Sequence, residues 1–171
     1  VSDIRKILTG EITDWNQIYP KSNLGKIQLV FDNANSSTVR FAIDSICQGK
    51  PLSPDLRAQK SNSGVIDYVA QDQNAIGVIG ASWIGNKSDT TNLSFSDKIT
   101  VMNVTADDVA TLANSYKPYQ AYLAMGTYPL TRNVYIIVTD PRSGLPTGFT
   151  TFVSSDKGQR IILKAGMVPA T

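Results

Sequence analysis

The strongest constraint on the fold of this chain is an apolar strand that runs through a polar turn into a helix. Residues 26–31 are almost continuously apolar, which is typical of a strand buried on both faces. The polar turn 32–35 follows, and from Ser36 onward the apolar residues recur at helical spacing. A second unit has a short amphipathic helix at 65–70 before an apolar strand at 75–80. This alternation predicts an α/β fold.

The second half of the chain has a different order of predicted elements. Strands are predicted at 99–104, 121–124 and 133–138 from their alternating or continuous apolar residues. Two helices are predicted after them, one opening at 148–153 and a last one at 156–163. Because strands cluster here, we expect this half to contribute to a second sheet.

Composition argues against several classes of function. The 171 residues are 42% hydrophobic and 18% charged, which fits a folded protein with a real core. The net charge of +2 is too small to indicate binding to nucleic acid or to anionic membranes. Histidine is absent, so the commonest general base and metal ligand is missing, and we expect neither an enzyme nor a cofactor. The single cysteine, Cys47, is expected to be buried and inert.

The turn between the first strand and its helix concentrates groups that bind anions. Ser36, Ser37 and Thr38 place hydroxyls where a helix begins, and the first amides of a helix lack intrahelical partners. The helix dipole adds to this preference for negative charge. A simpler interpretation stays open, in which Ser36 only caps the helix and the next two residues only form its first turn.

Further motifs along the chain are not explained by local structure. They are Leu8–Trp15, Asn74–Ile79, Tyr128–Arg132, Ser155–Ile161 and Gly166–Pro169. Together these motifs resemble those of phosphate-binding proteins that feed ABC importers and have the type II periplasmic solute-binding fold. The likeness is closer to the Bacteroidetes branch of that family, through Phe31–Asn33 and Ser82–Asn86.

The resemblance implies an α/β, two-lobe fold of the periplasmic-binding-protein type. Residues 1–95 would form a complete second lobe that carries the anion site at a helix start. Residues 96–171 would return as the C-terminal part of an incomplete first lobe. The helical pattern that begins at once after Val1 agrees with this, because it is typical of a chain cut from a longer precursor.

The family's phosphate motif, R-x-x-x-S-G-T, falls on the turn described above. Ser36, Ser37 and Thr38 stand at its serine, glycine and threonine. Asp32 stands at its arginine, and a carboxylate there repels phosphate unless it is protonated or turned away. Arg40 lies two residues beyond Thr38. The predicted ligand-binding residues are therefore Asp32, Ser36, Ser37, Thr38 and Arg40.

The implied function is that of a solute-binding protein without catalytic activity. It would capture phosphate or a related small oxyanion between its lobes, without metal or cofactor, and deliver it to an ABC permease in the inner membrane. The protein would be exported to the periplasm or the outer surface, and lipid attachment through a precursor segment stays open. The main alternative, motivated by Asp32, is a module of the same fold that recognises another ligand or a protein partner instead of phosphate.

Two rivals from other classes are an enzyme built on the fold and a purely structural or adhesive surface protein. The missing histidine argues against the first, and binding of any small ligand would argue against the second. Trp15 and Trp83 are expected to be packing anchors, and Gly77 and Gly80 to allow close packing.

Overall fold

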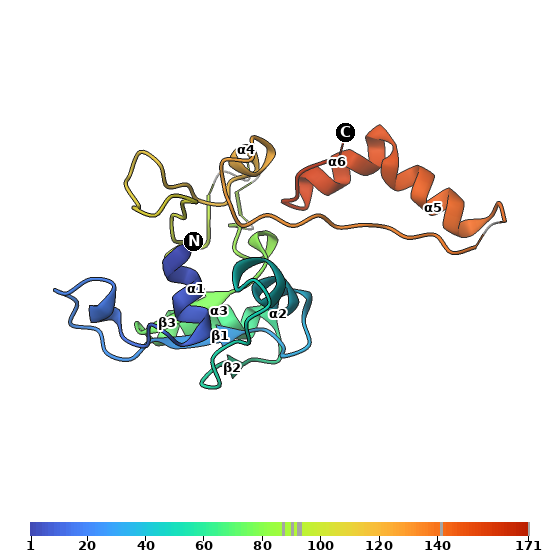
Figure 1. Ribbon diagram of the computed structural model, residues 1–171. Coiled ribbons are helices and arrows are strands. Elements are labelled where there is room, and N and C mark those ends of the chain that lie inside the picture. The colour runs from blue at the N-terminus through green and yellow to red at the C-terminus, as the bar shows by residue number, and fades with distance from the viewer. Residues whose placement is uncertain (87, 90, 92–93, 141, 171) are drawn as a thin grey trace.

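A computed structural model of the chain describes residues 1–86, 88–89, 91, 94–140 and 142–170. The first part, residues 1–85, forms an α/β unit, and the last part extends away from it (Figure 1). Among the described residues, no helix has the length and apolar character needed to cross a membrane.

A parallel sheet of three strands, in the order β2-β1-β3, forms the centre of the α/β unit. β1 spans Gln28–Phe31, β2 spans Arg57–Ala58 and β3 spans Ala75–Val78. The strands predicted at 26–31 and 75–80 are confirmed, with shorter bounds. β2 has no signal in the sequence, because its two residues are exposed at the sheet edge and have no apolar pattern.

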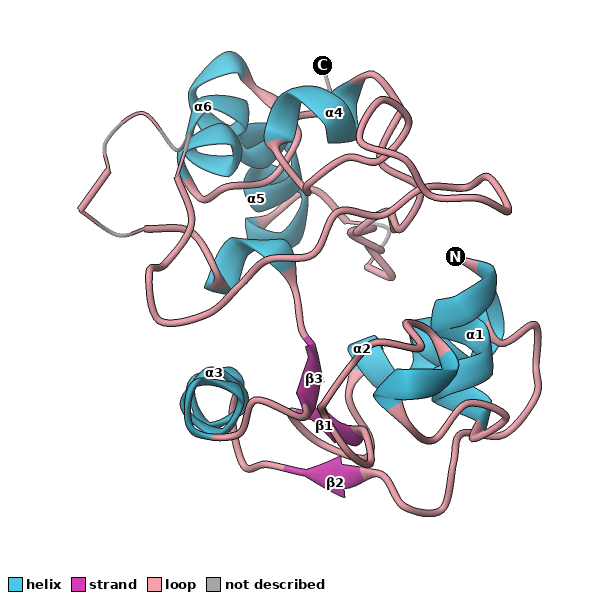
Figure 2. Cartoon of the chain, turned by 90° about the vertical axis from the view of Figure 1, so that its left-hand side faces the viewer, coloured by secondary structure: helices cyan, strands magenta, loops and turns pink. Residues whose placement is uncertain are grey.

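Helices cover both faces of this sheet (Figure 2). On one face lie α1 (Ser2–Thr9) and α2 (Ser37–Phe41), which continues as the π-helical turn η2 (Ala42–Ile46). On the other face lies α3 (Asn62–Gln71), which contacts β1 and β3. The apolar spacing in the sequence therefore predicts all three helices correctly. Two short 3₁₀ turns, η1 (Trp15–Gln17) and η3 (Ala81–Trp83), complete the unit.

The alternation of side chains along β1 divides the core between the two faces. Leu29 and Phe31, which are 5% and 0% exposed, belong to the cluster that packs with α1 and α2. Val30 between them is also fully buried, and it points to the face that α3 covers. Cys47 lies in the first cluster, which confirms the expectation of a buried thiol, and burial raises the pKa of that thiol.

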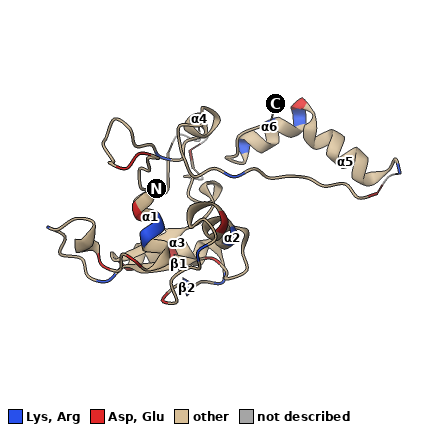
Figure 3. Cartoon of the chain, in the orientation of Figure 1, with Lys and Arg blue, Asp and Glu red and all other residues tan. Residues whose placement is uncertain are grey.

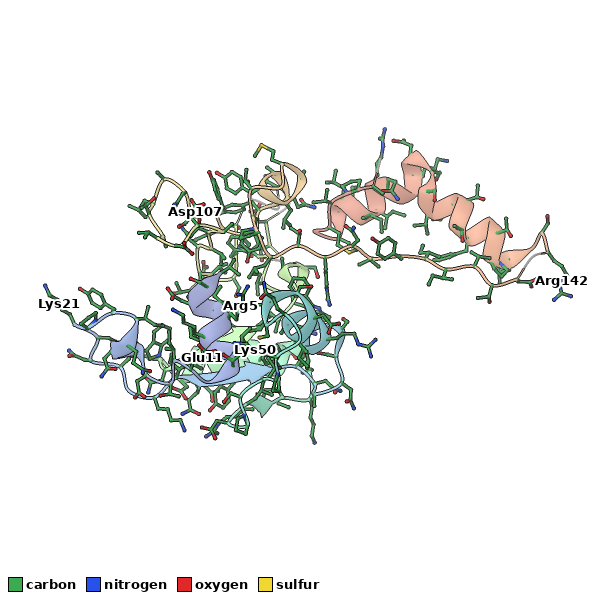
Figure 4. All side chains as sticks on the ribbon, viewed as in Figure 1. Arg5, Glu11, Lys21, Lys50, Asp107 and Arg142 are labelled. Carbon is green, nitrogen blue, oxygen red and sulfur yellow. The ribbon has the colours of Figure 1, made fainter. Side chains whose placement is uncertain are left out.

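One contact joins two helical segments to each other, and another brings a helix close to the sheet. Arg5 of α1 donates from Nε to the carbonyl oxygen of Ile46 at 2.7 Å, which joins α1 to η2 (Figure 4). On the other face, a Cβ added at Gly77 would lie 2.8 Å from Val65 Cγ1. Gly77 therefore allows α3 to approach β3, as predicted. The same prediction for Gly80 is wrong, because a Cβ there would meet only ordinary contacts, the nearest at 3.6 Å.

The strand predictions for the second half are wrong. Residues 99–104 contribute one isolated bridge, and residues 121–124 fall in the helix α4 (Gln120–Ala124). Residues 133–138 form no strand. A strand needs hydrogen bonds to a neighbour, and within the part of the chain that the structure describes no neighbouring strand pairs with these segments.

Two helices close the chain, as predicted. α5 spans Leu145–Ser154 and begins three residues before its predicted opening, because Pro146 suits the first turn of a helix. α6 spans Asp156–Lys164, and its N-cap Ser155 accepts a hydrogen bond from the backbone of Gly158 at 3.3 Å. We call residues 131–140 and 142–164 the C-terminal arm, which reaches outward from the rest of the molecule (Figure 1).

Polar and apolar contacts connect the second half to the α/β unit. The amino group of Val1 donates to the carbonyl oxygen of Thr105 at 2.8 Å, and Leu130 packs against the core cluster.

Within the second half, α4 holds the end of the arm. Gln120 in α4 donates to the carbonyl oxygens of Leu163 and Met167, at 2.8 and 2.9 Å. The arm is therefore held near its two ends, while most of its side chains between them are exposed.

Candidate anion-binding pocket

A pocket lies where the strands of the sheet end. The turns after β1 and β2 each lead from the carboxyl end of a parallel strand into the start of a helix, α2 and α3 respectively (Figure 2). Such turns meet at one edge of a parallel sheet, which is where open α/β sheets hold their ligands. The pocket has a volume of about 400 Å³ and is lined by Asp32, Asn33, Asn35, Ser36, Lys60, Ser61, Asn62, Ser63 and Trp83.

The start of α2 is organised by short polar side chains. Ser36 adopts an extended backbone, and its Oγ accepts from the amide of Val39 at 3.2 Å, so the capping role considered for Ser36 is confirmed. Asn33 shapes the turn before it, because its Oδ1 accepts from the amide of Asn35 at 2.8 Å. The next helical amide, that of Ser37, belongs to the group that has no intrahelical partner.

The start of α3 repeats this arrangement on the neighbouring turn. The Oγ of Ser61 accepts from the amide of Gly64 at 3.2 Å and lies 2.9 Å from the Oγ of Ser63. Lys60 and Asn62, beside this cap, also line the pocket. The prediction from sequence missed this second turn, although its Ser-Asn-Ser-Gly pattern carries the same capping signal as the first.

The five predicted ligand residues occupy different places. Asp32 and Ser36 line the pocket. Ser37 is exposed at the start of α2, and Thr38 is buried with 8% exposure. Arg40 is exposed further along α2 and is not among the residues that line the pocket. The pocket therefore brings two of the predicted residues together with the turn around Ser61.

Two oxygen atoms of the lining lack hydrogen-bond partners. They are Oδ1 of Asp32 and Oδ1 of Asn62, which come from the turns after β1 and β2. Both atoms are buried, and no donor reaches either of them within the described part of the chain. A buried acceptor without a donor costs about 1–3 kcal/mol.

The charges at the pocket are few and local. Among the lining residues, Lys60 is the one cation and Asp32 is the one anion. Elsewhere, basic and acidic side chains are interspersed along the chain (Figure 3). The field inside the pocket therefore comes mainly from Lys60, Asp32 and the partial positive charge of the helix amides.

Trp83 is the aromatic residue of the lining. It ends η3, and its side chain is 53% exposed, so the expectation that Trp83 is a packing anchor is wrong. Trp15 does act as an anchor, because it packs against the core cluster and donates from Nε1 to the carbonyl oxygen of Asn74 at 3.1 Å. Exposure, which the sequence pattern does not report, separates the two tryptophans.

Comparison with curated proteins finds a relative among phosphate-binding proteins. The phosphate-binding protein PstS of Pseudomonas aeruginosa is 28% identical over 148 residues, which cover 84% of this chain. The aligned part is 41% of the relative's length. This chain therefore spans less than half of the curated relatives that it matches.

Solved structures show the same fold. A Clostridium perfringens protein, described as a phosphate ABC transporter substrate-binding protein and solved with bound phosphate, is 20% identical with a TM-score of 0.69. An ABC-type phosphate transport receptor from Vibrio cholerae has the same identity and TM-score. The matches cover 99% and 98% of this chain, and 61% and 62% of the two structures.

The family model described as the PBP superfamily domain matches residues 1–157. The expected periplasmic-binding-protein fold of α/β class is confirmed by this match and by the solved structures. The likeness to the Bacteroidetes branch and the lobe boundary after residue 95 stay predictions. The chain belongs to the PBP superfamily.

Proposed function

We propose that the chain is part of the solute-binding component of an ABC importer and that it binds phosphate or a related small oxyanion in the pocket between α2 and α3. The observation that carries this proposal is the convergence of two helix starts on one pocket. Each start presents amides at the positive end of a helix, which attracts an anion. Lys60 adds a full positive charge at the same place.

Asp32 limits which oxyanion the pocket accepts. Its carboxylate repels a fully deprotonated anion such as sulfate. Phosphate near neutral pH carries a proton that it can donate to this carboxylate. The pocket therefore suits phosphate better than sulfate, even though no arginine is among the lining residues that the structure describes.

The transport role follows from the same assignment. The ligand would be held between two lobes that close about the segments near residues 80–100, and it would then pass to an ABC permease in the inner membrane. The protein would act in the periplasm or on the outer surface, with or without a lipid anchor. The binding step needs no catalysis, metal or cofactor in this proposal.

The test is titration calorimetry with the longest natural form of the protein that contains this sequence. We expect phosphate to bind at micromolar concentrations and sulfate to bind at least tenfold more weakly. The Lys60→Gln variant should lose about tenfold in phosphate affinity, because a charge-assisted contact is removed. The Lys21→Gln variant is the matched control, since Lys21 is exposed at a distant tip of the α/β unit (Figure 4).

Ser36 gives a second test of the same pocket. The Ser36→Ala variant removes the cap and costs about 1 kcal/mol of helix stability, so its fold is checked by circular dichroism. Equal phosphate affinity in Lys60→Gln, Ser36→Ala and the parent protein would refute this site. If neither anion binds, the family assignment stands and the module that does not bind phosphate becomes the better description.

A further inference from the structure

The two turns that line the pocket carry opposite charges. Asp32 belongs to the turn after β1, and Lys60 belongs to the turn after β2. They are the one anion and the one cation among the residues that line the pocket. A carboxylate repels an oxyanion, whereas an ammonium group attracts it. An oxyanion in this pocket is therefore drawn away from the turn after β1 and toward the turn after β2.

The hydroxyl groups at the start of α2 have limited access to the pocket. Ser37 and Thr38 are not among the lining residues, and Thr38 is only 8% exposed. Ser36 does line the pocket, but its Oγ already accepts from the amide of Val39 at 3.2 Å. Of the three hydroxyl groups that the sequence predicts as ligands, one therefore reaches the pocket.

The turn after β2 supplies a pair of hydroxyl groups beside Lys60. Ser61 and Ser63 both line the pocket, both are exposed, and their Oγ atoms lie 2.9 Å apart. Each hydroxyl has one hydrogen and two lone pairs, so Ser61 Oγ can accept from the amide of Gly64 and still pair with Ser63. One of the two O–H hydrogens lies between the oxygens of the pair. In either orientation, the other hydrogen is left to donate to a ligand.

From the charges and the hydroxyl pair we infer that Lys60 and Ser63, on the turn after β2, make the main side-chain contacts to the oxyanion, in place of Ser37 and Thr38. Lys60 would donate a charge-assisted hydrogen bond to one oxygen of the anion. The pair of Ser63 with Ser61 would donate a hydroxyl hydrogen bond to a second oxygen. This inference rests on the proposed function and specifies which side chains hold the anion in the proposed site.

The experiment is phosphate titration calorimetry with alanine variants of the same natural form of the protein. Ser63→Ala keeps the Ser61 cap of α3, so we expect a folded variant whose phosphate affinity falls by about tenfold, because a hydrogen bond to a charged group is lost. Ser37→Ala, on the other turn, should leave the phosphate affinity unchanged, because Ser37 does not line the pocket. Circular dichroism checks the fold of both variants.

The control variant is Ser45→Ala, which removes an exposed hydroxyl of η2 outside the pocket and should not change the phosphate affinity. An unchanged affinity in Ser63→Ala would overturn this inference and leave the proposed function intact. A loss in Ser37→Ala that equals or exceeds the loss in Ser63→Ala would have the same consequence. If the parent protein does not bind phosphate at all, both the proposed function and this inference are wrong.

Discussion

The α/β unit and the C-terminal arm contain similar apolar segments in opposite environments. In β1, Val30 and Phe31 have no exposed surface. In the arm, Val134 is 79% exposed and Ile137 is 83% exposed. The two segments have comparable composition, and both are predicted as strands. Apolar character therefore predicts burial only where the rest of the chain supplies a covering surface.

The difference has a structural cause. β1 has a parallel neighbour on each side and helices on both faces, so its backbone pairs at both edges and its apolar side chains are covered. Residues 133–138 pair with no other strand of the described chain. Continuous apolar strands of this kind are typical of sheets covered on both faces. The relatives of this chain are longer than it is, which leaves room in them for further elements of such a sheet.

The largest expected effect comes from removing the same side chain in both regions. Phe31→Ala should lower the free energy of unfolding by about 3–5 kcal/mol, because it leaves a cavity in a fully buried core. Phe149→Ala, at a residue of α5 that is 56% exposed, should change it by less than about 1 kcal/mol. Urea unfolding followed by circular dichroism measures both values. Similar losses in the two variants would contradict the comparison.

Glycine-to-alanine substitutions should change the stability of the two regions in opposite directions. Gly77→Ala should destabilise the α/β unit by about 1–3 kcal/mol, because the new Cβ would lie 2.8 Å from Val65. Gly148→Ala should stabilise α5 by about 0.5–1 kcal/mol, since that position is helical and open. Hydrogen exchange of the β3 and α5 amides reports each region separately. A stabilised β3 in Gly77→Ala would show that α3 moves away without cost.

Tyr128 lies just before the arm, so its ionisation can show which of the two regions buries it. Burial raises the pKa of Tyr128 from 10.0 to about 12. The folded protein therefore keeps this proton between pH 10 and pH 12 while the unfolded chain releases it, so stability falls as the pH rises through that window. Ultraviolet absorbance of the phenolate should show a late step near pH 12 that is missing in Tyr128→Phe. Loss of the late step in the Phe149→Ala variant would mean that the arm, rather than the unit, buries Tyr128.

The smallest expected effect on stability belongs to the exposed face of the arm. A Val134→Lys, Ile137→Lys double variant should change the free energy of unfolding by less than about 0.5 kcal/mol, because both side chains are exposed. It should also reduce self-association in sedimentation experiments, since exposed apolar segments promote aggregation. A loss of several kcal/mol would show instead that these side chains are covered in solution.

Local pattern predicts part of the binding pocket and misses the rest. The turn around Ser36 stands out because it joins a strongly apolar strand to a well-marked helix. The turn around Ser61 follows the two-residue strand β2, which has no apolar pattern, so nothing in the sequence places it beside the first turn. Trp83 joins the same pocket from a third segment, and its exposure depends on how η3 follows β3.

By itself, the sequence determined the elements whose apolar spacing and caps agree with their burial. These are α1, α2, α3, the strands β1 and β3, the last helices, and the membership of the PBP superfamily that the ordered motifs carry. Only the tertiary structure decided which turns meet, which tryptophan is exposed and which apolar segments have no partner. The physical reason is that spacing reports the preference of one segment, whereas a pocket or a paired strand requires contacts between segments distant in the chain.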